Sequence, residues 1–142
     1  LEEFGVRSEI WSATSYGELR RDGLEVDRWN RLNPDKPAKQ CYIESQLGNS
    51  KTPIIAVSDN MAAVPDLVRK WMPENYEVLG TDGFGRSDTR EALRRFFEID
   101  GVAVTLAALS QVVRKGDIDA KVYQTADKKF GVSNERTDIT EL

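Results

Sequence analysis

The 142-residue chain contains no histidine and only one cysteine, Cys41. Without histidine, these residues cannot form a Ser-His-Asp or Cys-His nucleophile system, a His-ligated zinc site or a histidine acid–base step. One cysteine cannot form an internal disulfide or a CxxC zinc or redox site. Because no histidine can activate Cys41, we predict that it is a small buried hydrophobic residue.

Positive charge and long apolar runs are also scarce. Lys and Arg number 20 against 24 Asp and Glu, a net charge of −4, whereas a protein that neutralises a phosphate backbone needs a basic excess. The longest apolar run, Val102 to Leu109, is interrupted by Thr105 and is far shorter than the roughly 18 residues of a membrane-spanning helix. We therefore expect neither nucleic acid nor a membrane as a partner.

The patterns that are present alternate between strand and helix. Strands are predicted within residues 4–14, 53–58 and 76–79, and helices within 15–32, 41–47, 59–72, 88–99, 102–115 and 118–130. Ser15, Asp59, Asp88 and Asp100 are placed to cap helices. This alternation predicts an α/β fold with a small, mostly parallel sheet flanked by helices.

Two expectations concern the extent of this domain. We assign residues 1–131 to it and residues 132–142 to a polar C-terminal tail. Three strands are few for so many helices, and Leu1-Glu2-Glu3-Phe4 is typical of the end of a helix. We therefore expect the domain to be N-terminally truncated here, with its first strand and helix upstream.

The glycine-rich loop Gly80–Ser87 is the main candidate site. It follows a predicted strand and precedes a helix, where backbone N–H groups can bind an anion. However, Asp88 stands where the dinucleotide motif has its third glycine, and the Gly-Lys-Ser/Thr ending of a P-loop is missing. A thiamin-type metal motif beginning at Asp82 is rejected, because no asparagine follows between Phe84 and Ser133. A structural loop is favoured, and an anion site remains the alternative.

The remaining polar and aromatic groups suggest structural roles. Trp11, Trp29 and Trp71 lie on apolar stripes and are predicted to be in the core or at an interface. Asp27 is placed to pair with Arg31 one helical turn later. The pairs Arg20-Arg21 and Arg94-Arg95 are expected to form surface ion pairs, with docking of an acidic partner as the alternative.

Two groups of motifs resemble a known family. The first is Trp11-Ser12-Ala13-Thr14-Ser15 with Glu18–Gly23 and Arg28-Trp29-Asn30, and the second is the long string Val78–Asp88. Together they resemble the C-terminal domain of the homodimeric pyruvate dehydrogenases, which are thiamin-diphosphate-dependent enzymes of the transketolase superfamily. The resemblance extends from about Phe4 to Phe130.

This resemblance implies an oxidoreductase that decarboxylates pyruvate and passes an acetyl group to a lipoyl group. It implies thiamin diphosphate and Mg2+ bound upstream, a cytoplasmic location, and three partners: the upstream domains, a homodimer partner and the dihydrolipoyl acyltransferase core. No catalytic, cofactor-binding or metal-binding residue is carried over to this chain, which is expected to serve assembly and to be inactive alone.

Three residues of the glycine-rich loop, Asp82, Phe84 and Arg86, are the candidates for interdomain or intersubunit contacts. Two alternatives remain open. One is a stand-alone α/β module that binds an anionic ligand at Gly80–Ser87. The other is a different thiamin enzyme of the same superfamily.

Overall fold

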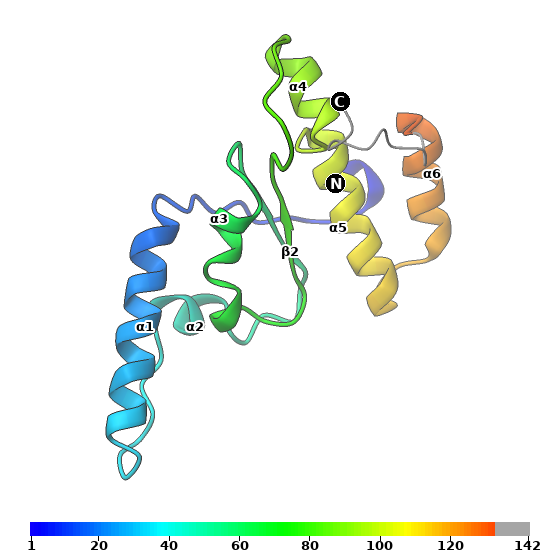
Figure 1. The fold of residues 1–142 in the computed structure, drawn as a ribbon. Coiled ribbons are helices and arrows are strands. Elements are labelled where there is room, and N and C mark those ends of the chain that lie inside the picture. The colour runs from blue at the N-terminus through cyan, green and yellow to red at the C-terminus, as the bar shows by residue number, and fades with distance from the viewer. Residues whose placement is uncertain (133–142) are drawn as a thin grey trace.

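Two parallel strands form the centre of the fold. A computed structural model describes residues 1–132 and pairs β1 (Ile54–Val57) with β2 (Tyr76–Leu79), with Ile54 opposite Tyr76 and Val57 opposite Leu79 (Figure 1). The connection passes through α3 (Ala63–Asp66) and the 3-10 helix η2 (Arg69–Trp71). The predicted α/β fold with a small parallel sheet is confirmed.

The strand predicted within residues 4–14 is wrong. A short 3-10 helix, η1 (Glu2–Phe4), ends at Gly5, and residues 6–14 continue without regular structure. Ile10 is 94% exposed and Trp11 is 53% exposed. An extended segment becomes a strand only where a neighbour pairs with its N–H and C=O groups, and within residues 1–132 the sheet has two strands.

One face of the sheet packs on the N-terminal helices. Side chains from β1 and β2 contact α1 (Tyr16–Leu32), α2 (Tyr42–Leu47) and η2 around a buried cluster of Cys41, Ile43, Val68, Trp71 and Tyr76. Cys41 is fully buried, as predicted, and burial raises the pKa of its thiol. Trp71 is also in this core, whereas Trp29 is only half-buried.

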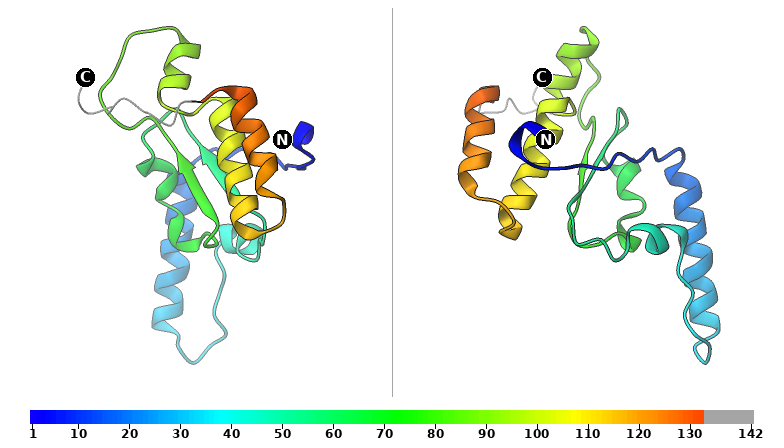
Figure 2. Two further views of the ribbon diagram at one scale, coloured as in Figure 1. Left: turned by 90° about the vertical axis from the view of Figure 1, so that its right-hand side faces the viewer. Right: turned by 180° about the vertical axis from the view of Figure 1, so that it is seen from behind.

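The opposite face packs on a helical pair. Helices α5 (Gly101–Lys115) and α6 (Ala120–Phe130) bury Leu106, Leu109 and Ala126 between them. Figures 1 and 2 show α5 on the sheet side of this pair and α6 farther out. From β2, Glu77 accepts a hydrogen bond of 2.6 Å from Gln111 of α5. The layers therefore follow in this order: the helices α1 and α2 with η2, the sheet of β1 and β2, then α5, and finally α6.

The predicted helix starts are partly confirmed. Ser15 caps α1 and Asp100 caps α5, each by accepting a hydrogen bond from a backbone N–H three residues later. Thr89, and not Asp88, caps α4 (Arg90–Phe96). The helix predicted from Asp59 is two short pieces, α3 and η2. Pro65 lies in the first turn of α3, where proline is tolerated because its missing N–H would have no helical partner.

The segment Arg90–Lys115 has the length and hydropathy of a membrane-crossing helix. This is weak evidence, because a packed core helix passes the same test. The structure divides the segment into α4 and α5, and Glu98 between them has φ 56°. Within the described residues α5 buries Leu106 and Leu109 against α6, and 17% of the apolar window is buried. The predicted tail lies, from residue 133 onward, outside the described residues.

Candidate functional site

The loops that follow β1 and β2 meet at the carboxyl edge of the sheet. Ser58 donates its N–H to the carbonyl of Leu79 at 3.1 Å, and Thr81 donates its N–H to Asn60 at 3.0 Å. The Thr81 hydroxyl donates to the carbonyl of Asp59 at 3.0 Å. In parallel sheets this edge is where ligands bind, so these bonds hold together the base of a candidate site.

Gly80 allows the two loops to approach this closely. A Cβ atom at this position would lie 2.4 Å from the backbone nitrogen of Ala62 and 2.9 Å from the carbonyl oxygen of Asn60. Any side chain would push these loops apart. The favoured sequence interpretation, a loop shaped by its glycines, therefore has a structural basis at Gly80.

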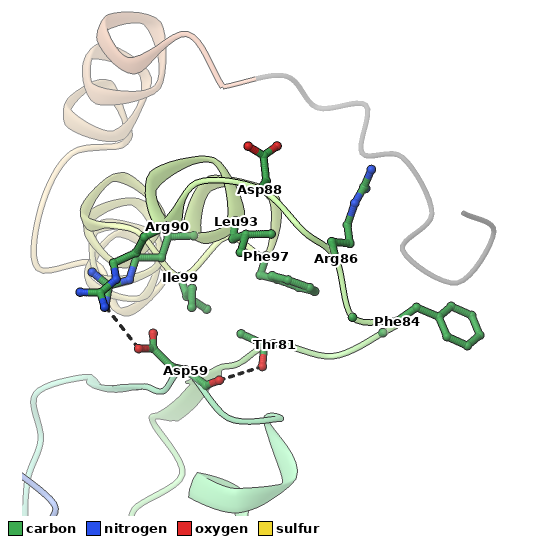
Figure 3. A pocket seen from close by; sticks show the side chains of 12 residues that line it. Asp59, Thr81, Phe84, Arg86, Asp88, Arg90, Leu93, Phe97 and Ile99 are labelled. Atoms are coloured by element: carbon green, nitrogen blue, oxygen red, sulfur yellow. Dashed lines mark hydrogen bonds and ion pairs between the residues drawn. The ribbon is translucent and has the colours of Figure 1, made fainter.

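A cavity of about 480 Å³ lies between this edge and α4. Figure 3 shows Asp59 and Thr81 on its sheet side and Leu93, Phe97 and Ile99 on its helix side. Its charged wall consists of Asp59, Arg86, Asp88, Arg90 and Arg94. The cavity therefore combines a small apolar surface with more cationic than anionic side chains.

Two of the arginines are held by contacts within the domain. A guanidinium nitrogen of Arg94 lies 3.3 Å from a carboxylate oxygen of Asp59, which confirms the predicted surface ion pair for Arg94. The guanidinium carbon of Arg86 lies 4.1 Å from the centre of the Phe96 ring, within the range of a cation–π contact. Elsewhere, Arg21 pairs with Glu18 and Glu25, as expected.

The three predicted interface residues occupy different positions. Asp82 accepts a hydrogen bond of 3.0 Å from the N–H of Ala62, which ties the two loops together. Phe84 is 65% exposed, and Figure 3 shows its ring pointing away from the cavity. Arg86 lines the cavity and is exposed. Phe84 is thus presented outward, whereas Asp82 and Arg86 both have contacts inside the domain.

Sequence reasoning did not place Asp59, Arg90 or Arg94 in this site: Asp59 was expected only as a helix cap and Arg94 only as a surface ion-pair residue. A usable signal was present for Asp59, because it directly follows the predicted strand within residues 53–58, just as Thr81 of the candidate loop comes two residues after the strand within 76–79. The carboxyl ends of parallel strands meet at one edge. The two arginines carried no such signal, since their placement depends on how α4 is oriented over that edge.

The site can be compared with the needs of a magnesium–diphosphate group. Such a group needs several oxygen ligands for the cation. Within residues 1–132, no cluster of three or more His, Cys, Asp or Glu side chains could hold a metal ion, and Asp59 is paired with Arg94. The described residues do not fit this group, and we derive no catalytic step through it here.

A family profile described as "transketolase-like TK C-terminal domain" matches residues 1–100. The chain belongs to this family. The resemblance found in the sequence is therefore confirmed, and the small parallel sheet is consistent with the family assignment.

Several curated relatives carry the name pyruvate dehydrogenase E1 component. The chain is 49% identical to the protein of Pseudomonas aeruginosa over 135 residues, which are 94% of this chain and 15% of that protein. It is 42% identical to the Mycolicibacterium smegmatis protein over 93% of this chain and 14% of that protein. It is 41% identical to the Escherichia coli K12 protein over 95% of this chain and 15% of that protein. The chain thus spans about one seventh of the length of these relatives.

Proposed function

We propose that this domain is part of the E1 component of a pyruvate dehydrogenase complex, the enzyme that decarboxylates pyruvate and transfers an acetyl group to a lipoyl group. The 49% identity to the Pseudomonas aeruginosa E1 component, over 94% of the chain, carries this proposal. The string Val78–Asp88 supports it from the sequence. In this proposal the whole polypeptide is an oxidoreductase.

Within that enzyme, the domain serves assembly. Its residues include no histidine, and no metal-ligand cluster occurs within residues 1–132. Thiamin diphosphate and Mg2+ would bind to other parts of the polypeptide, where they supply the electron sink for decarboxylation. The proposed partners are those other parts, a second copy in a homodimer, and the dihydrolipoyl acyltransferase core, in the cytoplasm.

The size of the native polypeptide tests this proposal first. An antibody against the peptide Val132–Leu142 is used on lysate from the source cells. A band several-fold larger than 16.0 kDa, in a precipitate that decarboxylates pyruvate, is the expected result. A precipitate that instead prefers another 2-oxoacid would identify a different thiamin enzyme of the superfamily. A single band at 16.0 kDa would contradict the proposal.

Within the assembly role, Phe84 and Arg86 are the proposed contacts with another domain or subunit. An exposed aromatic ring beside an arginine is the composition favoured at the centre of protein interfaces. Arg86→Glu in the full polypeptide is expected to weaken dimerisation or activity, measured by sedimentation and pyruvate decarboxylation. Arg114→Glu, an equal charge change at the exposed end of α5, is the control. An Arg86→Glu protein that stays fully dimeric and active would refute this contact.

A second candidate function is binding of an anionic ligand at Gly80–Ser87. The observation that favours it is the presence of Arg86, Arg90 and Arg94 around one cavity. Thermal-shift screening with nucleotides and sugar phosphates is the test. Binding at about 100 times the dissociation constant should stabilise the protein by roughly 2.7 kcal/mol. A flat response across the panel would leave this candidate without support.

A further inference from the structure

The outer side of α1 carries a row of alternating arginine and leucine. Arg20, Leu24, Arg28 and Leu32 follow one another at four-residue spacing. Side chains at this spacing lie above one another on a helix. All four are exposed, with Leu24 at 43% and Leu32 at 58%. We name these four residues the Arg–Leu row.

The Arg–Leu row faces away from the core of the domain. The buried cluster is contacted by Leu19 and Val26, and Gly23 lies against the ring of Trp71. On a helix with 3.6 residues per turn, these positions share one face, and Arg28 lies opposite to it. The leucines of the row therefore contribute nothing to the core that the inner face forms.

The charges of the row are available to a partner. Among the ion pairs of residues 1–132, Arg21 pairs with Glu18 and Glu25, whereas neither Arg20 nor Arg28 has a carboxylate within pairing distance. Continuing along the same side of the helix, Arg31 is also exposed. Three cationic groups thus accompany two exposed leucines along a helix about 26 Å long.

The far end of this surface is held in one conformation. The side-chain amide of Asn30 donates to the carbonyl of Lys39 at 2.9 Å and accepts from its N–H at 2.8 Å. The Lys39 ammonium lies 4.1 Å from the centre of the Trp29 ring. Figures 1 and 2 show this end of α1 and the turn after it extending beyond α2 and α3. A surface that is already ordered loses little conformational entropy on binding.

From this arrangement we propose that the Arg–Leu row docks an acidic amphipathic helix of a partner protein, in which Glu or Asp alternates with apolar residues at the same spacing. Rows of side chains four residues apart are the ridges that pack between helices. Carboxylates would pair with Arg20 and Arg28, and apolar side chains would cover Leu24 and Leu32. This inference does not depend on whether the whole polypeptide decarboxylates pyruvate.

Two other anionic partners fit less well. A nucleic acid would leave the two leucines against phosphates, and the chain has a net charge of −4, which opposes binding to a polyanion. A helix that lies on an anionic membrane inserts a broad apolar face, but the apolar face of α1 is already packed on the core. Both remain outcomes that the experiment distinguishes.

The test measures binding of a labelled synthetic helix by the full polypeptide of the source cells. The probe is a peptide of about 18 residues, roughly 27 Å of helix, with Glu and Leu alternating at four-residue spacing. Its Gln-for-Glu counterpart, a DNA oligonucleotide and phosphatidylserine vesicles are the comparison probes. The variants are Arg20→Glu with Arg28→Glu, Leu24→Ser with Leu32→Ser, and a control, Lys121→Glu with Lys128→Glu, on the exposed side of α6.

The acidic peptide is expected to bind the unmodified protein, more weakly as salt is raised. The arginine variant should lose about tenfold or more in affinity, equivalent to roughly 1.4 kcal/mol. The leucine variant should lose affinity without a change in the salt dependence, and the control should bind normally. The proposal is overturned if the unmodified protein does not bind the peptide, if all variants bind it equally, or if DNA or vesicles bind more tightly.

Discussion

Gly23 in the middle of α1 lies directly under the indole ring of Trp71. A Cβ atom built at Gly23 would come within 2.5 to 2.7 Å of three ring atoms of Trp71. Gly23 is buried, and Trp71 is only 5% exposed. The glycine that weakens the helix by its low propensity is therefore the position where the largest side chain of this core packs against the helix backbone.

We predict that Gly23→Ala destabilises α1 although alanine is the better helix former. The added methyl group must displace a buried ring, and overpacking of this kind costs about 1–3 kcal/mol, more than the gain of up to ~1 kcal/mol in propensity. Hydrogen exchange of the α1 amides measures the effect. Gly17→Ala is the matched control, because its nearest neighbour, the Ser15 hydroxyl oxygen, would be 3.8 Å away. Faster exchange should occur only for Gly23→Ala, and unchanged exchange would contradict the prediction.

Sequence patterns predicted the elements whose signals are local. Ser15 and Asp100 mark helix starts through side-chain caps, and Gly116 ends α5 with φ 83°. The apolar runs at Ile54 and Tyr76 predicted both strands and their parallel pairing. Each of these features depends on residues a few positions apart, so single-sequence reasoning can recover it.

The failures concern features that depend on distant partners. Ile10 and Trp11 have strand-forming side chains, but within the described residues they have no strand beside them. Asp27 was expected to pair with Arg31, yet the structure pairs it with Lys70, 43 positions away. In the candidate site, Asp82 bonds to Ala62 across 20 positions. Helical periodicity contains no information about contacts of this range.

For Asp82, we predict a structural effect that depends on its side-chain oxygen. Asp82→Ala leaves the N–H of Ala62 without its acceptor and should lower the free energy of unfolding by about 0.5–2 kcal/mol. Asp82→Asn keeps an acceptor oxygen at the same place and should restore most of this loss. Differential scanning fluorimetry of both variants is the measurement. Equal loss in the two variants would show that the charge, and not the hydrogen bond, matters.

From the ion pair between Asp27 and Lys70 we predict that the folded protein loses stability at acidic pH. The hydrogen bond from the Lys70 ammonium holds the pKa of the Asp27 carboxyl below its ordinary value of 3.8. Between these two pKa values the unfolded chain binds more protons than the folded one. The contribution of Asp27 is therefore present above pH 3.8 and is lost as the pH falls below that value toward the pKa of the folded state.

Lys70→Gln is expected to flatten this acid dependence. The pKa of Asp27 should rise toward its ordinary value, and the midpoint of thermal unfolding should fall less between about pH 5 and pH 2 than in the unmodified protein. Lys51→Gln, which removes an exposed charge outside the ion pairs of the described residues, is the control. If Lys70→Gln and the unmodified protein show the same acid slope, the pair does not stabilise the fold.

For Tyr76 we predict the opposite pH dependence: its contribution to the stability of the fold is lost at alkaline pH. Its hydroxyl donates a hydrogen bond of 2.9 Å to the carbonyl of Pro65 inside the core, and burial raises the pKa of this hydroxyl above its ordinary value of 10.0. Above pH 10 the unfolded chain loses this proton first, so stability falls as the pH rises toward the pKa of the folded state. A phenylalanine at this position has no proton to lose.

Tyr76→Phe should therefore be less stable at neutral pH but less sensitive to alkali. Without the Tyr76 hydroxyl, the Pro65 carbonyl keeps the long hydrogen bond of 3.5 Å from the N–H of Val68, and the lost hydrogen bond costs about 0.5–1.5 kcal/mol. The difference in unfolding midpoint between the two proteins should be largest near pH 7 and should shrink above about pH 10. Tyr42→Phe, at an exposed position, should show neither effect. A difference that stays constant from neutral to alkaline pH would show that Tyr76 ionises as readily in the folded protein as in the unfolded chain.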